Sequence, residues 1–112
     1  MIQQDIFTAL AAVAAGRVFP NIAPNNVPKP YVVYARISSA PENTMADGAP
    51  VKNTRLQVDC FDTTYAAAVA LAEAVKSAMK NSAITSLLIL EQDQFEPEAN
   101  AHRVILDFSI WH

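Results

Sequence analysis

The chain has 112 residues, a length that suits one domain with an ordinary core and no crosslinks. Its net charge is −3 and its eight Lys and Arg residues are scattered, which argues against nucleic-acid binding through a basic patch. A single cysteine, Cys60, excludes an intramolecular disulfide and a zinc site built on several cysteines, so cytoplasmic synthesis is the default expectation. No apolar stretch is long enough to span a bilayer, and the N-terminus, with Asp5 and no positive segment, does not resemble a signal peptide.

The first thirty residues divide into a helix and an extended arm. Residues 2–15 are predicted to be helical because Ile6, Leu10 and Val13 share one stripe, and Gly16 offers a C-cap. Residues 17–30 contain four of the seven prolines, which excludes a helix or a central strand. We expect this arm to be held against the core by its apolar residues, Val18, Phe19, Ile22 and Val27.

Two strands and a long polar segment follow. Residues 31–38 are β-branched and aromatic and predict a strand, whose outer face would carry Val32, Tyr34, Arg36 and Ser38. Residues 39–53 include Pro41, Pro50 and Asp47-Gly48, and predict a mobile loop between antiparallel strands. Residues 54–61 alternate, with Leu56, Val58 and Cys60 on one face and Arg55, Gln57, Asp59 and Phe61 on the other.

A second helix and two further strands complete the pattern. Asp62 or Thr63 is expected to cap a helix that ends at Asn81 and Ser82. Its apolar stripe comprises Tyr65, Ala68, Val69, Ala72, Val75 and Met79. Residues 86–97 predict a third strand, and residues 102–111 a fourth with Val104, Leu106, Phe108 and Ile110 on one face.

The order α-β-β-α-β-β predicts one α+β domain over residues 1–112, with a four-stranded antiparallel sheet and both helices on one face. The other face would mix aromatic, aliphatic and charged side chains, unlike a plain solvent-exposed face. We therefore expect a partner, most simply a second copy, to cover it. The predicted subunit interface comprises Tyr34, Arg36, Arg55, Phe61, Arg103, Ile105, Asp107 and Trp111.

Candidate chemical groups are few, and no catalytic residue, cofactor or metal site is predicted. His102 and His112 lack metal-ligand spacing, and Cys60 reads as a buried apolar residue. With two glycines, the chain has no glycine-rich phosphate loop. The acids considered for acid–base or metal chemistry are Asp59, Asp62, Asp93, Glu96, Glu98 and Asp107. Pairing of Asp59 and Asp107 with Arg36, Arg55 and Arg103 is the favoured interpretation over a carboxylate site.

Three segments together resemble the small tail completion proteins of long-tailed phages, also called tail terminator or head–tail joining proteins, of the domain-of-unknown-function 3168 type. The first is the Pro-rich arm leading into Pro30-Tyr31-Val32-Val33-Tyr34. The second is Gln57-Val58-Asp59-Cys60 followed by Thr64-Tyr65 and the alanine-rich helix. The third runs from Arg103-Val104 to Asp107-Phe108-Ser109-Ile110-Trp111. Phe61 stands where the family often has tryptophan.

This resemblance implies a structural protein and no enzyme. Family members cap the finished tail tube, stop its growth and offer the head a joining surface, usually as a ring of six in the virion. The implied partners are other copies of the chain, the tail tube protein and the head connector, at the tail–head junction of a virion made in the bacterial cytoplasm. The polar segment would contact the tail through Glu42, Asn43, Thr44, Met45, Asp47 and Lys52.

An alternative from a different class stays open at this point. The chain could be a small dimeric α+β domain that binds a ligand or catalyses a reaction. Its pocket would lie between the sheet and the Pro-rich arm, and the acids of the outer face would form the site. A third possibility is an interaction module with no phage role. A closed apolar pocket with convergent polar groups would favour the dimeric domain.

Overall fold

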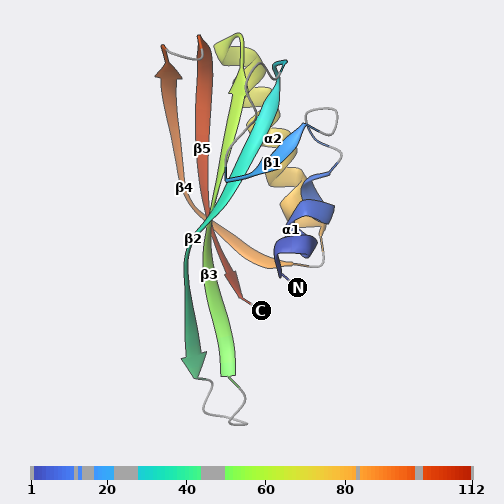
Figure 1. Cartoon of the computed structure of the whole chain (residues 1–112), viewed down its shortest axis with the longest axis vertical. Helices are drawn as coiled ribbons and strands as arrows, with labels where there is room; N and C mark the ends of the chain where they lie inside the picture. The colour runs from blue at the N-terminus through green and yellow to red at the C-terminus, as the bar shows by residue number, and fades with distance from the viewer. Residues whose placement is uncertain are drawn as a thin grey trace.

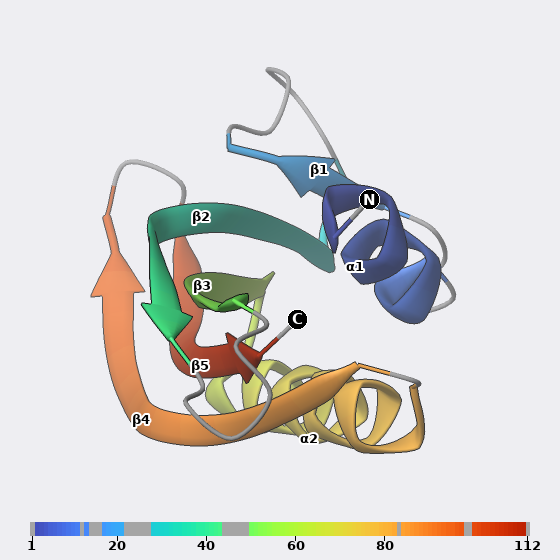
Figure 2. The same ribbon diagram turned by 90° about the horizontal axis from the view of Figure 1, so that it is seen from below.

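The computed structural model describes residues 2–11, 13, 17–21, 28–43, 50–82, 84–97 and 100–111. The helices are α1 (Ile2–Leu10) and α2 (Tyr65–Asn81), and the strands are β1 (Val18–Pro20), β2 (Tyr31–Asn43), β3 (Pro50–Asp62), β4 (Thr85–Glu96) and β5 (Ala101–Trp111). The strands form one curled sheet in the order β1-β2-β3-β5-β4 (Figures 1 and 2). Among the described residues, no helix is both long and apolar enough to cross a membrane.

The sheet has five strands and mixed direction, so the prediction of four antiparallel strands is wrong in part. The additional strand, β1, lies in the Pro-rich arm and pairs in parallel with β2, from Val18↔Val32 to Pro20↔Tyr34. It is an edge strand, where a proline without a backbone donor is tolerated. A segment of three residues is too short for its periodicity to be recognised in the sequence.

The strands β2 and β3 form a long antiparallel hairpin that replaces most of the predicted loop. Their pairing continues from Tyr31↔Phe61 to Asn43↔Pro50, with an irregularity between Arg36 and Ser38. Residues 39–43 and 50–53, predicted to be loop, are therefore strand, while residues 44–49 lie outside the described part. In Figure 1 the hairpin extends well beyond the helices, along a molecule whose longest axis is 49 Å.

One face of the sheet, the helix face, packs against both helices. Val32, Cys60 and Val104 lie in one row across β2, β3 and β5, and each is at most 1% exposed. The next row contains Tyr34, Val58 and Leu106, which are also buried. The helices complete this core with Ile6 and Leu10 from α1 and with Ala68, Leu71, Ala72, Val75 and Met79 from α2.

The predicted orientation of β2 is wrong. Val32 and Tyr34 were expected to face outward, but they belong to the core, while Tyr31 and Val33 lie on the opposite face. Four consecutive apolar residues, Tyr31 to Tyr34, make either orientation compatible with the sequence. Pairing with β3 decides between them, because residues directly opposite in a ladder share a face.

The N-cap of α2 lies one residue after Thr63, the later of the two predicted caps. Thr64 is the N-cap, and its hydroxyl accepts a hydrogen bond from the amide of Ala67 at 3.1 Å. Asp62 instead accepts from the amide of Thr63. The predicted end is confirmed, since Ser82 is the C-cap. Tyr65 was expected on the buried stripe but is half-exposed.

The helix α1 matches its prediction over Ile2–Leu10, and Ile6 and Leu10 are buried as expected. Val13 packs against the core as a partly buried residue. Residues 12 and 14–16, including the predicted C-cap Gly16, lie outside the described residues, as do Ile22 and Val27 of the arm.

Exchanging valine for threonine at adjacent positions of β2 tests the orientation of this strand. Val32→Thr places a hydroxyl in the dry core and is expected to lower the free energy of unfolding by about 1–3 kcal/mol. Val33→Thr, the matched control on the outer side, is expected to cost clearly less. Urea denaturation measures both, and equal losses would contradict the orientation described.

Removing the cap of α2 tests its starting point. Thr64→Ala is expected to cost about 1 kcal/mol of stability, because the Ala67 amide loses its acceptor. Thr63→Ala, one residue earlier, should change stability by less than about 0.5 kcal/mol, as exposed substitutions usually do. Thermal unfolding of the two variants side by side gives the comparison, and a larger loss at Thr63 would place the cap where the sequence suggested.

Candidate interaction surface

The sheet face opposite the helices, called the outer face, carries most of the predicted interface. Pairing places Arg55 opposite Ser109, Gln57 opposite Asp107, Asp59 opposite Ile105, Phe61 opposite Arg103 and Asn53 opposite Trp111. On β2 the same face presents Tyr31, Val33 and Ala35. Six of the eight predicted interface residues therefore share one surface: Arg55, Phe61, Arg103, Ile105, Asp107 and Trp111.

Two predicted interface residues lie elsewhere. Tyr34 is 7% exposed and packs in the core between β2 and the helices. Arg36 is exposed, but it lies opposite Leu56, a core residue, and so belongs to the helix face beyond the helices. Both errors follow from the inverted orientation of β2.

Arg103, near the beginning of β5, is the centre of a cluster of side chains on the outer face. Its guanidinium donates to Asp59 Oδ2 at 2.7 Å and to Glu96 Oε1 at 2.7 Å. The same group lies over the Phe61 ring, with its central carbon 5.6 Å from the ring centroid, and Tyr31 stacks on Phe61 at 4.7 Å between centroids. Burial lowers the pKa of Arg103, but the bonds to Glu96 and Asp59 outweigh it and raise the pKa above its usual value.

A second polar group lies along the same face. Arg55 donates two hydrogen bonds to the carboxylate of Asp107, at 2.5 Å and 3.3 Å. The side-chain amide of Gln57 donates to Asp59 at 2.9 Å, and that of Asn53 donates to the hydroxyl of Ser109 at 2.7 Å. The predicted pairing of Asp59 and Asp107 with arginines is confirmed, with Arg103 and Arg55 as the partners.

These pairs leave little scope for acid–base chemistry on the outer face. Asp59 and Asp107 are each bound to an arginine, so their carboxylates are already engaged in ion pairs within the sheet. Of the other acids considered, Asp93 accepts from the Tyr65 hydroxyl at 2.7 Å, and Asp62 accepts from the backbone amide of Thr63. Glu98 is outside the described residues.

Cys60 and His102, the other residues that could carry chemistry, are also packed within the fold. Burial raises the pKa of the Cys60 thiol to about 12, which keeps it protonated at neutral pH and a poor nucleophile. His102 packs edge-on against Tyr65 and Phe95, and His112 is not among the described residues. Within the described ranges, no group of three or more His, Cys, Asp or Glu residues could hold a metal ion.

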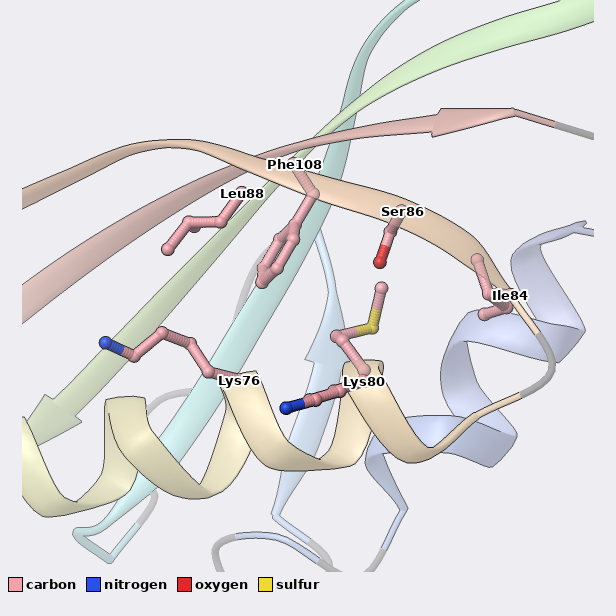
Figure 3. A pocket seen from close by; sticks show the side chains of 7 residues that line it. Lys76, Lys80, Ile84, Ser86, Leu88 and Phe108 are labelled. Carbon is pink, nitrogen blue, oxygen red and sulfur yellow. The ribbon is translucent and has the colours of Figure 1, made fainter.

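A pocket of about 330 Å³ lies between α2 and the first part of β4 (Figure 3). Its floor is apolar, with Met79, Leu88 and Phe108, and two lysines of α2 lie beside it. One of them, Lys76, is bound to Glu73 at 2.9 Å and to Glu91 at 3.2 Å, so it is already neutralised. This pocket is not at the position between sheet and Pro-rich arm that the ligand-binding alternative requires.

The most apolar exposed surface was not predicted. Four side chains of β4 are half-exposed, Leu87, Ile89, Leu90 and Phe95, at 46–59%. In the part of the chain that the structure describes, β4 pairs with β5 alone, so its other edge is open. The available signal was the run Leu87-Leu88-Ile89-Leu90, which is more apolar than a strand with one buried face requires.

Three of the six predicted tail-contact residues lie in the described part of the β2–β3 hairpin. Glu42 and Asn43 belong to β2, and Lys52 belongs to β3. Thr44, Met45 and Asp47 lie outside the described residues. Contact of any of these residues with a tail stays a prediction.

Removing either arginine of the outer face tests the network. Arg103→Met leaves the carboxylate of Asp59, whose side chain is 11% exposed, without its cation and is expected to cost about 1–3 kcal/mol of stability. Arg55→Met should cost less, because the Arg55 side chain is 41% exposed and its ion pair is screened by water. Adding Asp59→Asn to Arg103→Met should recover part of the loss in urea denaturation. No recovery would show that Arg103 acts through packing and not through charge.

Comparison with known proteins identifies the family. Residues 4–112 match the family model described as tail completion protein gp17. A solved structure titled as the virion of a native gene transfer agent particle contains a chain with the same fold, at a TM-score of 0.78 and 17% identity, covering 98% of this chain and 92% of that one. A search of curated proteins found no match. Because the family match spans nearly the whole chain, this protein belongs to the tail completion protein gp17 family, a family of structural phage proteins.

Proposed function

We propose that this protein caps the phage tail tube, ends tail polymerisation and provides the surface to which the head joins. It would act as a ring of copies, with six as the expected number, at the tail–head junction of the virion. The observation that carries the proposal is the family match over residues 4–112. The shared fold with a chain of a gene transfer agent virion supports a place in a particle of this kind.

The surface of the described residues agrees with a role in docking. The acids of the outer face are bound to arginines, and the thiol of Cys60 is buried, so these groups serve the fold. The large exposed apolar side chains instead gather on β4, with single ones on other elements. Exposed apolar side chains concentrated on one element are typical of a surface that a partner covers.

The β2–β3 hairpin is the part that we assign to the tail tube. It extends beyond the helices in Figure 1, so its end can reach into a neighbouring ring of tail protein without moving the core. The backbones of Tyr31–Asn43 and Pro50–Asp62 are paired, so the hairpin is more rigid than the loop that the sequence predicts. Its polar and charged residues, including Glu42, Asn43 and Lys52, would give the contact specificity.

Removal of the gene from the virus is the direct test of the proposal. Electron microscopy of lysates should show tails of excess length or tails without heads, and supplying the protein in trans should restore joined particles. Normal tail length and normal head attachment without the gene would overturn the proposed function.

Shortening the hairpin separates the tail contact from folding. Replacing residues 42–52 by an Asn-Gly turn should leave the melting temperature almost unchanged, because the core rows lie nearer the helices. Such a variant should fail to restore tail length or head joining in the complementation assay. Ser77→Ala, an exposed change on α2, is the matched control and should complement fully. A shortened hairpin that complements fully would show that the hairpin end is not the tail contact.

A further inference from the structure

We propose that copies of this protein join by antiparallel pairing of the open edge of β4 in one copy with the open edge of β2 in the next. The first surface, the β4 edge, is the unpaired side of Thr85–Glu96. The second, the β2 edge, is the side of β2 that β1 leaves uncovered at residues 35–43. This inference rests on the proposed function, because it names the surfaces through which the proposed ring closes.

The β4 edge has the properties of a surface that is meant to be paired. The strand is twelve residues long, and the side chains of Leu87, Ile89, Leu90 and Phe95 beside this edge are half-exposed. Open edges that stay unpaired in natural proteins are usually short or protected by lysine or proline. The strand β4 contains neither residue. The part from Thr85 to Leu90 also lacks a charged residue, and such an apolar edge favours pairing with a partner strand, while the acids that follow it restrict which strand can pair.

The β2 edge is open because β1 is short. The three residues of β1 pair with β2 only from Val32 to Tyr34. Beyond that point, β3 is the one neighbour of β2 among the described strands. Ile37, at the irregularity of the ladder, is 55% exposed, and Arg36 beside it is also exposed. The β2 edge therefore offers a backbone ladder, an apolar side chain and a cation.

The directions of the strands make the two edges compatible. β2 is antiparallel to β3, β3 to β5, and β5 to β4, so β2 and β4 run in opposite directions. When a second copy related by rotation about a ring axis is placed edge to edge, its β2 is antiparallel to the first copy's β4. Such a head-to-tail contact uses a different surface on each side, and it generates a closed ring when the rotation between neighbouring copies closes.

Charge favours this contact over pairing between two β4 edges. The second half of β4 contains Glu91, Asp93 and Glu96 and no cation. A two-fold contact between β4 strands would bring these acids near the same acids of the partner, and like charges across a ladder are destabilising. The β2 edge contains one cation, Arg36, and one acid, Glu42, so it brings no net negative charge against the acids of β4.

Blocking each edge separately provides the test. Ile37→Lys blocks the β2 edge, and Ile89→Lys blocks the β4 edge, each by placing a charge at an exposed position. Phe7→Lys on α1, 44% exposed and in neither strand, is the matched control. Association of the full chains is measured by sedimentation velocity over a range of concentrations, free and with purified tail tubes, after circular dichroism shows equal melting temperatures.

A head-to-tail contact gives a distinctive result. Each edge variant alone should lose association by about tenfold or more, while the control associates like the unmodified chain. An equal mixture of the two edge variants should form a complex of two chains and no larger species, because each variant retains one intact edge. Self-association of Ile37→Lys alone would indicate a symmetric β4 contact and overturn the proposal, as would normal association of both variants. An unmodified chain that stays monomeric even on tail tubes would overturn the proposed ring itself, and this inference with it.

Discussion

The strand β3 is the constraint on which the rest of the structure depends. It pairs on both sides, with β2 and β5, and its alternating residues supply both faces of the sheet. Leu56, Val58 and Cys60 are buried under the helices, while Arg55, Gln57 and Asp59 point to the outer face. Because side chains alternate with a period of two, a slip by one residue would place charges in the core, so this register is strongly specified.

Apolar packing stabilises the helix face and ion pairs stabilise the outer face. This difference affects where a partner binds. The helix face is dry and close-packed, with alanines at 68 and 72 letting α2 approach the sheet. The outer face is polar and pairs its own charges, so a partner would gain little from neutralising them. Uncovered apolar area lies mainly on β4, where Leu87 and Leu90 share the outer face, opposite Ser109 and Asp107. Burial of apolar area drives association more than exposed ion pairs do, which favours the part of the sheet along β4 over the ion pairs of β3 and β5 as the docking surface.

Much of the secondary structure could be predicted because its signals are local. Periodicity predicts the capped alanine-rich helix, the alternating strand β3 and the closing strand β5. The observed bounds differ from these predictions by few residues. The predictions failed where the signal was ambiguous or short. Residues 31–34 are apolar on both sides, β1 has three residues, and residues 39–43 and 50–53 have polar and proline-containing sequences that read as loop.

The sequence by itself determined the α+β class, the family resemblance, the second helix and the acid–arginine pairing, because each rests on residue type and spacing along a continuous segment. Only the tertiary structure decided the orientation of β2, the parallel addition of β1 and the length of the hairpin. These features depend on hydrogen bonds between segments far apart in the chain, such as that from the Asn21 amide to the Tyr34 carbonyl at 2.8 Å. The open edge of β4 belongs to the same class, since a strand is an edge only by virtue of where the other strands end.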